Sequence, residues 1–578
     1  MTSPPRKRAR SEDGAISIGR HTSDSIHRFH THLRAQSADL KTLTDSYHCV
    51  SLVFPSLLRT SIRIFPGQHE RMFSHMGLPI VQEIGEQIQC LQAPSSLVLL
   101  GTYGAGKSHL LSVLASFLFA QGKRVVFLPE CPLIAEDTVF GLKLAFSVAF
   151  ADDPQTMQRI LLFNTTSDFV QFARECHPDI YFLVHGFDQV GRDFRDVITA
   201  TTASHFFIYT AYALDTLTSR HAPSVRIRSG FTSDEFAQWV HHYEDQLPIG
   251  IKNYMPYIEY ISGGVPYFLY PLFGFGGKKC VDSLSQYRMG PHFETLVDQV
   301  AEGITATEKH TASQKSRYSQ LMNACLTETI PEARPGANAA LYDPRYFYFD
   351  KDRKGHCVCG VARDVMIDFF RAAGDMSLFT SDAWYTCVRS GNPNPSLRQS
   401  AIVQICLTRI GVGGLSQADA QGHAMRILTF RHTPNFGAMF EEAWSAPHVC
   451  KFVSAVILRI SPRDKMAHLI PLQVAVGQGL TCVDLATSFF AVVWHQWEAA
   501  IREEGFNVVN TFVCIDSLAP ESEEVIRMSN DFREKVKFVS PAYTVRNLNA
   551  AQLDPKLGRI LKPEEFPVPE TSPGNVFQ

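Results

Sequence analysis

The feature that most constrains the fold is an eight-residue loop between a short apolar run and a helix-like pattern. Residues 97–100 (LVLL) are wholly apolar, as expected for a buried parallel strand. After the loop, leucines recur at helical spacing until Gly122, and residues 125–128 (VVFL) form a second apolar run. The sequence therefore predicts a strand–loop–helix–strand unit of an α/β fold with a parallel sheet. The loop, GTYGAGKS, matches the pattern G-x-x-x-x-G-K-[ST].

Each fixed residue of this loop has a chemical reason for its place. The glycines let backbone N–H groups approach and surround phosphate oxygens. Lys107 offers a positive charge to the β- and γ-phosphates, Ser108 offers its hydroxyl to Mg²⁺, and the helix N-terminus favours an anion. We therefore predict a P-loop NTPase that binds ATP or GTP with Mg²⁺; the loop contacts phosphates and does not indicate the base. The predicted binding residues are Gly101, Thr102, Tyr103, Gly104, Ala105, Gly106, Lys107, Ser108 and His109.

A second acidic group is expected after another apolar strand, residues 180–184 (IYFLV). Asp188 is the candidate, and together with Ser108 it makes up the predicted metal site. It comes slightly late, because His185 occupies the position where the acid usually stands. Gln189 follows where many such ATPases carry a glutamate. Since glutamine can orient water but cannot accept its proton, hydrolysis is expected to be slow.

The predicted catalytic residues for nucleotide hydrolysis are therefore Lys107, Asp188 and Gln189. The alternative for Asp188 is a surface aspartate that merely follows a core strand. Thr210, after the apolar run HFFIY, either contacts the γ-phosphate or is an ordinary strand residue. Residues 261–273 (ISGGVPYFLYPLF) predict a helix–turn–helix junction that packs against the nucleotide domain, with no chemical role for its glycines.

Composition excludes several classes of protein. The 578 residues are enough for three or four compact units. With 54 Lys and Arg against 57 Asp and Glu, the net charge is −3, so nucleic-acid binding would need a local basic patch. No run of about 20 apolar residues predicts a membrane span. The 13 scattered cysteines indicate a reducing compartment, and the pair Cys357 and Cys359 is predicted to be buried rather than zinc-bound.

The pattern along the chain predicts six regions. The first carries a basic cluster (RKRAR, residues 6–10) that fits a nuclear localisation signal or a merely solvated tail, and no secretory signal is visible. Residues 345–365 predict a hairpin that leads into a helix. The expected regions are a disordered basic arm (1–45), a P-loop NTPase core (46–225), a helical lid (226–330), a linking α+β region (340–424), an α/β domain (425–550) and a disordered tail (551–578).

The order of these motifs resembles the Crinkler-type effectors of oomycetes and chytrid fungi and the related retrotransposon hot spot proteins. The resemblance runs from LVLLGTYGAGKS through FLVHGFDQV, SGGVPYFL and DPRYFYFDKDRKGHCVCGVARDV to FGAMFEEAW and HLIPLQVAV. It implies a P-loop NTPase joined to a C-terminal restriction-endonuclease-like domain. It also implies a protein that acts on DNA in the nucleus of a host cell, with host nuclear proteins or a second copy as partners.

Carried over by this resemblance, Glu441 or Glu442 in FEEAW matches the first acid of the nuclease, and Gln473 matches a strand position before a catalytic lysine. Ala475 stands where that lysine would be, and Asp464 comes only after the preceding strand. Such nucleases need acidic oxygen ligands for Mg²⁺ and a lysine beside the attacking water.

A degenerate domain kept for binding is therefore an open alternative to a nuclease. In that case the protein is a scaffold that is switched by the nucleotide. A small-molecule kinase is a third alternative, although such kinases are usually one compact domain.

Overall fold

The computed structural model describes most of the chain between Ser23 and Leu561. The described residues are 23–36, 38–58, 72–176, 180–212, 223–227, 230–288, 290–372, 381–389, 395–413, 427–429, 443–445, 455–461, 464–474, 486, 489–490, 494–516, 524–526 and 543–561. They form two compact units. The first comprises Met1–Glu244 and Val265–Phe273, and the second comprises Asp245–Gly264 and Gly274–Gln578.

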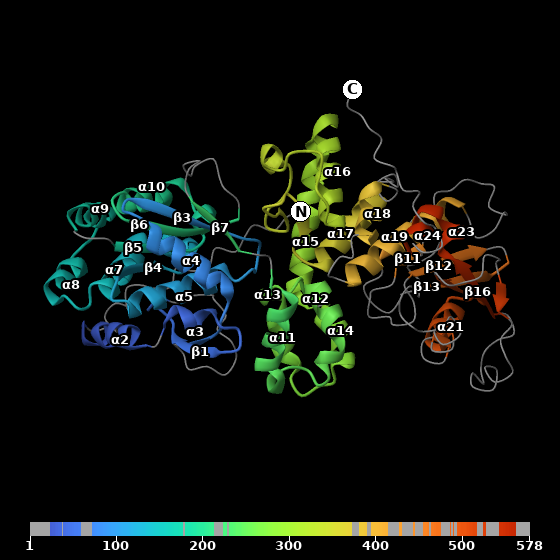
Figure 1. The fold of residues 1–578 in the computed structure, drawn as a ribbon, viewed down its shortest axis with the longest axis horizontal. Helices are drawn as coiled ribbons and strands as arrows, with labels where there is room; N and C mark the ends of the chain where they lie inside the picture. The colour runs from blue at the N-terminus through green and yellow to red at the C-terminus, as the bar shows by residue number, and fades with distance from the viewer. Residues whose placement is uncertain are drawn as a thin grey trace, which may run out of the picture. The chain divides into compact units, whose positions relative to one another are not determined.

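The first unit is built on a five-stranded parallel sheet in the order β4-β5-β6-β3-β7 (Figure 1). A separate antiparallel pair is formed by β1 and β2. The elements of this unit are α2 (Ser23–Ala35), α3 (Leu40–Thr44), β1 (Cys49–Val53), β2 (Met72–Met76), α4 (Pro79–Cys90), β3 (Ser95–Leu100), α5 (Lys107–Ala120), β4 (Arg124–Leu128), α6 (Cys131–Ile134), α7 (Thr138–Ala149), α8 (Pro154–Leu161), α9 (Thr166–Glu175), β5 (Ile180–Val184), α10 (Arg192–Thr202), β6 (Phe206–Ala211), β7 (Ser224–Arg226), α11 (Ser233–His242) and α13 (Pro266–Leu269).

Both faces of this sheet are covered, because alternate residues of each strand point to opposite sides. On one face, Leu97 and Leu99 of β3 share a core with apolar residues of α2, α4 and α5. On the other face, Val98 and Leu100 share a core with apolar residues of α7, α9 and α10, Phe146 among them. The apolar runs within β3, β4, β5 and β6 are therefore buried on both faces, which is the pattern that predicted a parallel sheet.

Two predictions about the ends of the chain are wrong for the described residues. The expected disordered arm (1–45) includes α2, whose residues Ile26, Phe29 and Leu33 are buried in the core beside α5. These three apolar side chains lie on one face of a helix, a pattern that the polar average of the segment conceals. The expected disordered tail (551–578) begins with helical residues, and the carboxylate of Asp554 is buried against the Tyr385 hydroxyl at 2.7 Å.

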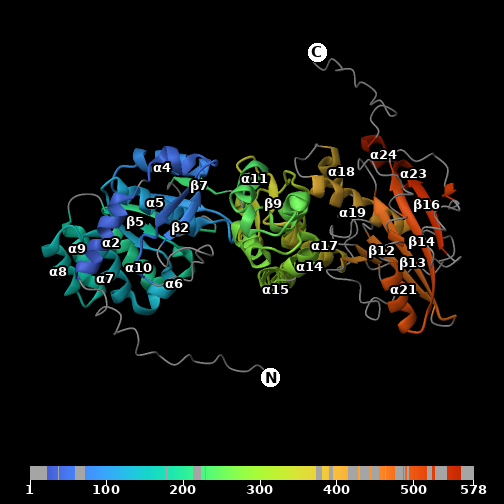
Figure 2. The ribbon, with the colours of Figure 1, turned by 90° about the horizontal axis from the view of Figure 1, so that it is seen from below.

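The second unit contains the remaining helices and a seven-stranded mixed sheet in the order β10-β11-β12-β13-β14-β16-β15 (Figure 2). Strands β12 and β13 are antiparallel, whereas β13, β14 and β16 are mutually parallel. The elements are α12 (Met255–Ser262), α14 (Cys280–Arg288), α15 (Pro291–Ala306), α16 (Ala312–Thr327), β8 (Phe347–Phe349), β9 (Gly355–Cys357), α17 (Gly360–Ala372), α18 (Asp382–Arg389), α19 (Pro395–Gly413), β10 (Ile427–Thr429), β11 (Ala443–Ser445), β12 (Ala455–Ser461), β13 (Met466–Val474), α21 (Trp494–Glu503), β14 (Asn507–Asp516), β15 (Glu524–Ile526), β16 (Tyr543–Asn549), α23 (Ala550–Leu553) and α24 (Pro555–Leu561).

Several local predictions are confirmed in this unit. The hairpin formed by β8 and β9 leads into α17, as the sequence indicated. Cys357 and Cys359 are buried, with exposed fractions of 8% and 3%. The region 226–330 holds helices α11 to α16, of which α11 and α13 belong to the first unit, and its role as a lid stays a prediction. Among the described helices, none has both the length and the apolar character that crossing a membrane requires.

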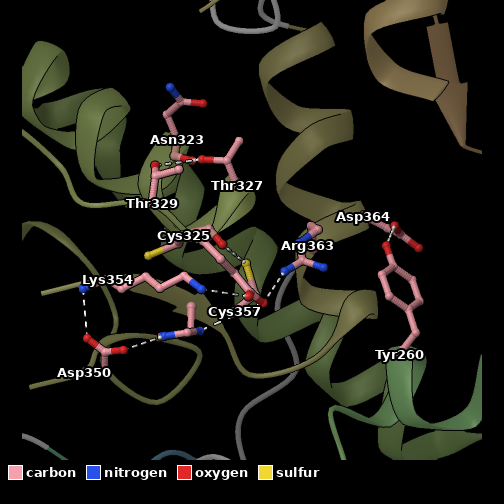
Figure 3. A network of polar contacts seen from close by, with 12 residues as sticks. Tyr260, Asn323, Cys325, Thr327, Thr329, Asp350, Lys354, Cys357, Arg363 and Asp364 are labelled. Carbon is pink, nitrogen blue, oxygen red and sulfur yellow. Dashed lines mark hydrogen bonds and ion pairs between the residues drawn. The ribbon is translucent and has the colours of Figure 1, made fainter. Parts of the chain in front are cut away.

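A network of charged side chains joins the hairpin, α16 and α17 (Figure 3). Arg363 of α17 is 6% exposed at its side chain, and its Nη2 lies 3.3 Å from Oε1 of Glu328. The Nζ atom of Lys354 lies 3.6 Å from Oε2 of the same carboxylate. Nearby, Nε2 of His356 lies 3.1 Å from Oδ2 of Asp350. The buried guanidinium is thus compensated by a carboxylate, as a buried charge requires.

Candidate phosphate-binding site

The predicted loop joins β3 to α5, and its backbone needs glycine at two positions. Gly104 and Gly106 have φ angles of +74° and +86°, which are in the left-handed region that L side chains rarely adopt. A Cβ atom on Gly104 would also lie 2.5 Å from Cβ of Tyr267. Gly106 is the N-cap of α5, so the helix begins at Lys107. The free N–H groups of its first turn therefore lie at the loop, where an anion is favoured.

Lys107 is buried inside this loop, with 5% of its surface exposed. Its Nζ donates hydrogen bonds of 2.7 Å to the backbone carbonyls of Gly101 and Thr102, and it lies 4.0 Å from the centroid of the Tyr212 ring. Burial lowers the pKa of this amine to about 7, and the negative charge of Asp188 opposes the shift. The amine therefore has carbonyl oxygens as its hydrogen-bond acceptors, and a phosphate would have to compete with them.

The hydroxyl of Ser108 takes part in a chain of three hydrogen-bonded side chains. Ser108 Oγ lies 2.7 Å from Nε2 of His185, and Nδ1 of the same ring lies 2.8 Å from Oγ1 of Thr210. Thr210 also accepts a hydrogen bond of 3.0 Å from the N–H of Gly186. Burial and the charge of Lys107 lower the pKa of His185 to about 3. The side chain that faces Ser108 is therefore an uncharged imidazole, and Thr210 fixes its orientation.

Asp188 lies three residues beyond His185, in a 3₁₀ turn (Phe187–Gln189). Its Oδ2 accepts a hydrogen bond of 2.9 Å from the backbone N–H of Tyr212. The negative charge of Asp188 acts on Lys107 and raises the pKa of that amine, against the lowering caused by burial. Gln189 is exposed. The structure thus brings Lys107 into the electrostatic range of Asp188, whereas pairing of Ser108 with Asp188 at a metal stays a prediction.

A segment distant in the sequence lies against the loop. The N–H of Tyr267 donates a 3.4 Å hydrogen bond to the carbonyl of Gly104, and its ring packs edge-on against Tyr103 at 5.0 Å between centroids. Cγ of Pro266 would lie 3.8 Å from a Cβ on Gly106. The sequence predicted that this junction packs against the nucleotide domain, which is confirmed. The parts played by Tyr212 and Tyr267 were not predicted, because no local motif marks them.

His109 was predicted to bind the phosphates, but its ring has other neighbours. Its Nε2 lies 3.1 Å from Nδ1 of His75, and its ring packs edge-on against Phe73 at 5.3 Å between centroids. Burial lowers the pKa of His109 to about 3. The ring of His109 therefore packs against β2. The backbone N–H of His109 is the part of the residue for which phosphate binding stays a prediction.

The predicted nuclease residues are only partly covered by the structure. Glu441, Glu442 and Ala475 lie outside the described residues. Gln473 lies on β13, in register with Cys514 of β14, and is 4% exposed. Asp464 is exposed at the turn that precedes β13. Within the described part of the chain, no three His, Cys, Asp or Glu side chains are grouped so that they could hold a metal ion.

No family model matches this sequence, and no curated protein matches it either. A solved structure that it matches is that of a signal transduction ATPase with numerous domains (STAND), with a tetratricopeptide repeat sensor, from Pyrococcus horikoshii. The sequence identity is 12% and the TM-score is 0.22. The match covers 62% of this chain and 50% of that protein. The resemblance to Crinkler-type effectors stays a prediction.

Proposed function

We propose that this protein binds the phosphates of a nucleoside triphosphate, ATP or GTP, at the loop between β3 and α5. The observation that supports this most is Lys107, an amine that is 5% exposed and whose hydrogen bonds go to two backbone carbonyls. Among the described residues, no carboxylate lies within ion-pair distance of this amine. Burial disfavours the charged form of this amine and lowers its pKa to about 7, and an anion bound at the N-terminus of α5 would stabilise that charged form.

The backbone around this lysine supports the same proposal. Gly104 and Gly106 have the left-handed φ angles with which anion-binding loops present backbone N–H groups to a phosphate. The dipole of α5, a helix of 14 residues, adds positive potential at the same point. The adjoining ends of β5 and β6 bring His185 and Thr210 to the carboxyl edge of the sheet, which is where ligands bind in open α/β sheets.

The experiment is a titration of the protein with ATP and with GTP, by calorimetry, for the wild type and for Lys107→Ala. We expect binding by the wild type and a loss of at least about tenfold in affinity for the variant, since a charged hydrogen-bond donor to the phosphates is removed. Lys123→Ala is the matched control, because Lys123 is exposed just before β4 of the same unit. Equal affinity of Lys107→Ala and wild type would contradict the proposal.

A second proposal concerns the C-terminal sheet, which we infer to be directed at DNA and coupled to the nucleotide state. Its support is the mixed sheet in which β13 carries Gln473, the residue that the resemblance to Crinkler-type effectors matches to the nuclease. Cleavage of plasmid DNA with Mg²⁺, lost in Glu441→Ala and Glu442→Ala, would support a nuclease. Binding of DNA without cleavage would support the scaffold instead, and the absence of both would contradict this second proposal.

A further inference from the structure

The hydroxyl of Ser108 is the point at which this site departs from a magnesium-dependent one. In P-loop proteins, the Ser or Thr of the loop and an Asp after a neighbouring strand hold Mg²⁺ together. Here the residue directly after β5 is His185, and its Nε2 lies 2.7 Å from Ser108 Oγ. Within the described residues, this ring nitrogen is the hydrogen-bond partner of Ser108 Oγ that the structure shows. The place of the acid is thus occupied by an imidazole.

An imidazole cannot replace the acid in the binding of Mg²⁺. This ion prefers oxygen ligands in an octahedral arrangement, and carboxylates contribute both oxygen and negative charge. A histidine ring supplies nitrogen and is neutral or positive in every protonation state. The site residues therefore do not fit a magnesium ion at Ser108.

The surroundings of the ring show that it is held in place. Thr210, which is fully buried, hydrogen-bonds Nδ1 of His185 at 2.8 Å, and the same hydroxyl accepts the N–H of Gly186. The backbone of His185 is also fixed, because its N–H donates to the carbonyl of Leu128 at 2.9 Å. Because both the ring nitrogen Nδ1 and the backbone of His185 are held by hydrogen bonds, Nε2 stays directed at Ser108.

Asp188 is an acid near the loop among the described residues, and part of its carboxylate already has a hydrogen-bond partner. One of its carboxylate oxygens accepts the N–H of Tyr212 at 2.9 Å, and its charge acts on Lys107. These contacts give Asp188 two structural roles: it binds the backbone N–H of Tyr212, directly after β6, and it stabilises the charged form of Lys107. They do not require a metal ion.

We propose that His185 positions the Ser108 hydroxyl in place of a metal-binding acid, so that the protein binds its nucleotide with little dependence on Mg²⁺. The inference rests on the proposed function, because it concerns the same loop. In this arrangement Lys107, the loop N–H groups and the N-terminus of α5 compensate the charge of the phosphates. His185 is a positioning residue that acts through Ser108.

The test compares ATP affinity in Mg²⁺ with ATP affinity in EDTA, by calorimetry on the full chain. For the wild type we expect the two dissociation constants to agree within about threefold. For His185→Asp, which restores the acid, we expect binding at least about tenfold tighter in Mg²⁺ than in EDTA. His185→Asn is the matched control, because it keeps a neutral polar side chain and should remain insensitive to Mg²⁺.

Wild-type binding that weakens by tenfold or more in EDTA would overturn the inference. If Asp188→Asn then removed this dependence, the metal would be assigned to Ser108 and Asp188. The wild-type comparison needs no variant, so it decides the question even if His185→Asp does not fold. Failure of the proposed function gives a different result, the absence of ATP binding in both Mg²⁺ and EDTA, and that result also overturns the inference.

Discussion

Replacing Lys107 with methionine should change how the stability of the protein depends on pH. In the folded protein burial lowers the pKa of this amine from 10.5 to about 7. The unfolded chain therefore binds one more proton than the folded chain between about pH 7 and pH 10.5. Because the unfolded state binds more protons, the free energy of unfolding rises with pH in this window, and the penalty is greatest below pH 7.

The magnitude follows from the two pKa values. Each unit of difference corresponds to about 1.4 kcal/mol, so the wild type should gain about 2 kcal/mol of stability between pH 7 and pH 9 that Lys107→Met does not gain. Urea unfolding of both proteins at the two pH values measures this, and the difference between them cancels the other titrating groups. An equal change in both proteins would refute the account of a desolvated lysine.

The same shift predicts a proton taken up when the nucleotide binds. At pH 8 an amine with a pKa of about 7 is mostly neutral, and bound phosphate favours its charged form. Calorimetric titration with ATP in two buffers of different ionisation enthalpy should show uptake of up to about one proton per nucleotide. A binding enthalpy that does not depend on the buffer would contradict the assignment of Lys107 to the phosphates.

Two further predictions concern side chains that are packed inside one unit each. Phe146→Ala should lower the free energy of unfolding by about 3–5 kcal/mol, because this ring is fully buried and packs against Phe182. The control is Leu162→Ala: this side chain is 77% exposed, so its loss should change the free energy of unfolding by under about 0.5 kcal/mol. Glu328→Ala should cost about 3–5 kcal/mol, since it leaves the Arg363 guanidinium buried without its carboxylate. Urea unfolding measures each change, and small losses at Phe146 or Glu328 would contradict the packing described.

The sequence predicted the parts of the fold in which one local pattern decides the structure. Strand β5 is wholly apolar and β3 and β6 are largely so, and burial on both faces of a parallel sheet requires such runs. Helix α2 was missed because its buried face consists of only four residues, three of them apolar, within a polar segment. Composition averages over the two faces of such a helix, whereas folding depends on one of them.

The candidate site was predicted where its residues are contiguous in the sequence. The loop from Gly101 to Ser108 could be recognised because glycines, a lysine and a hydroxyl have fixed spacing for phosphate binding. The contacts of Tyr212 and Tyr267 could not be predicted, since they depend on how the residue after β6 and the first turn of α13 reach the loop. Tertiary structure, rather than sequence spacing, determines those distances.

The most direct test of phosphate binding is hydrogen–deuterium exchange with and without ATP. The account predicts slower exchange in peptides that cover residues 101–112 and 265–269, because the loop N–H groups bind phosphate and the adjacent segment contacts the loop. The same slowing should be absent in Lys107→Ala. Unchanged exchange in residues 101–112, or equal slowing in Lys107→Ala, would contradict the claim that this loop is the nucleotide site.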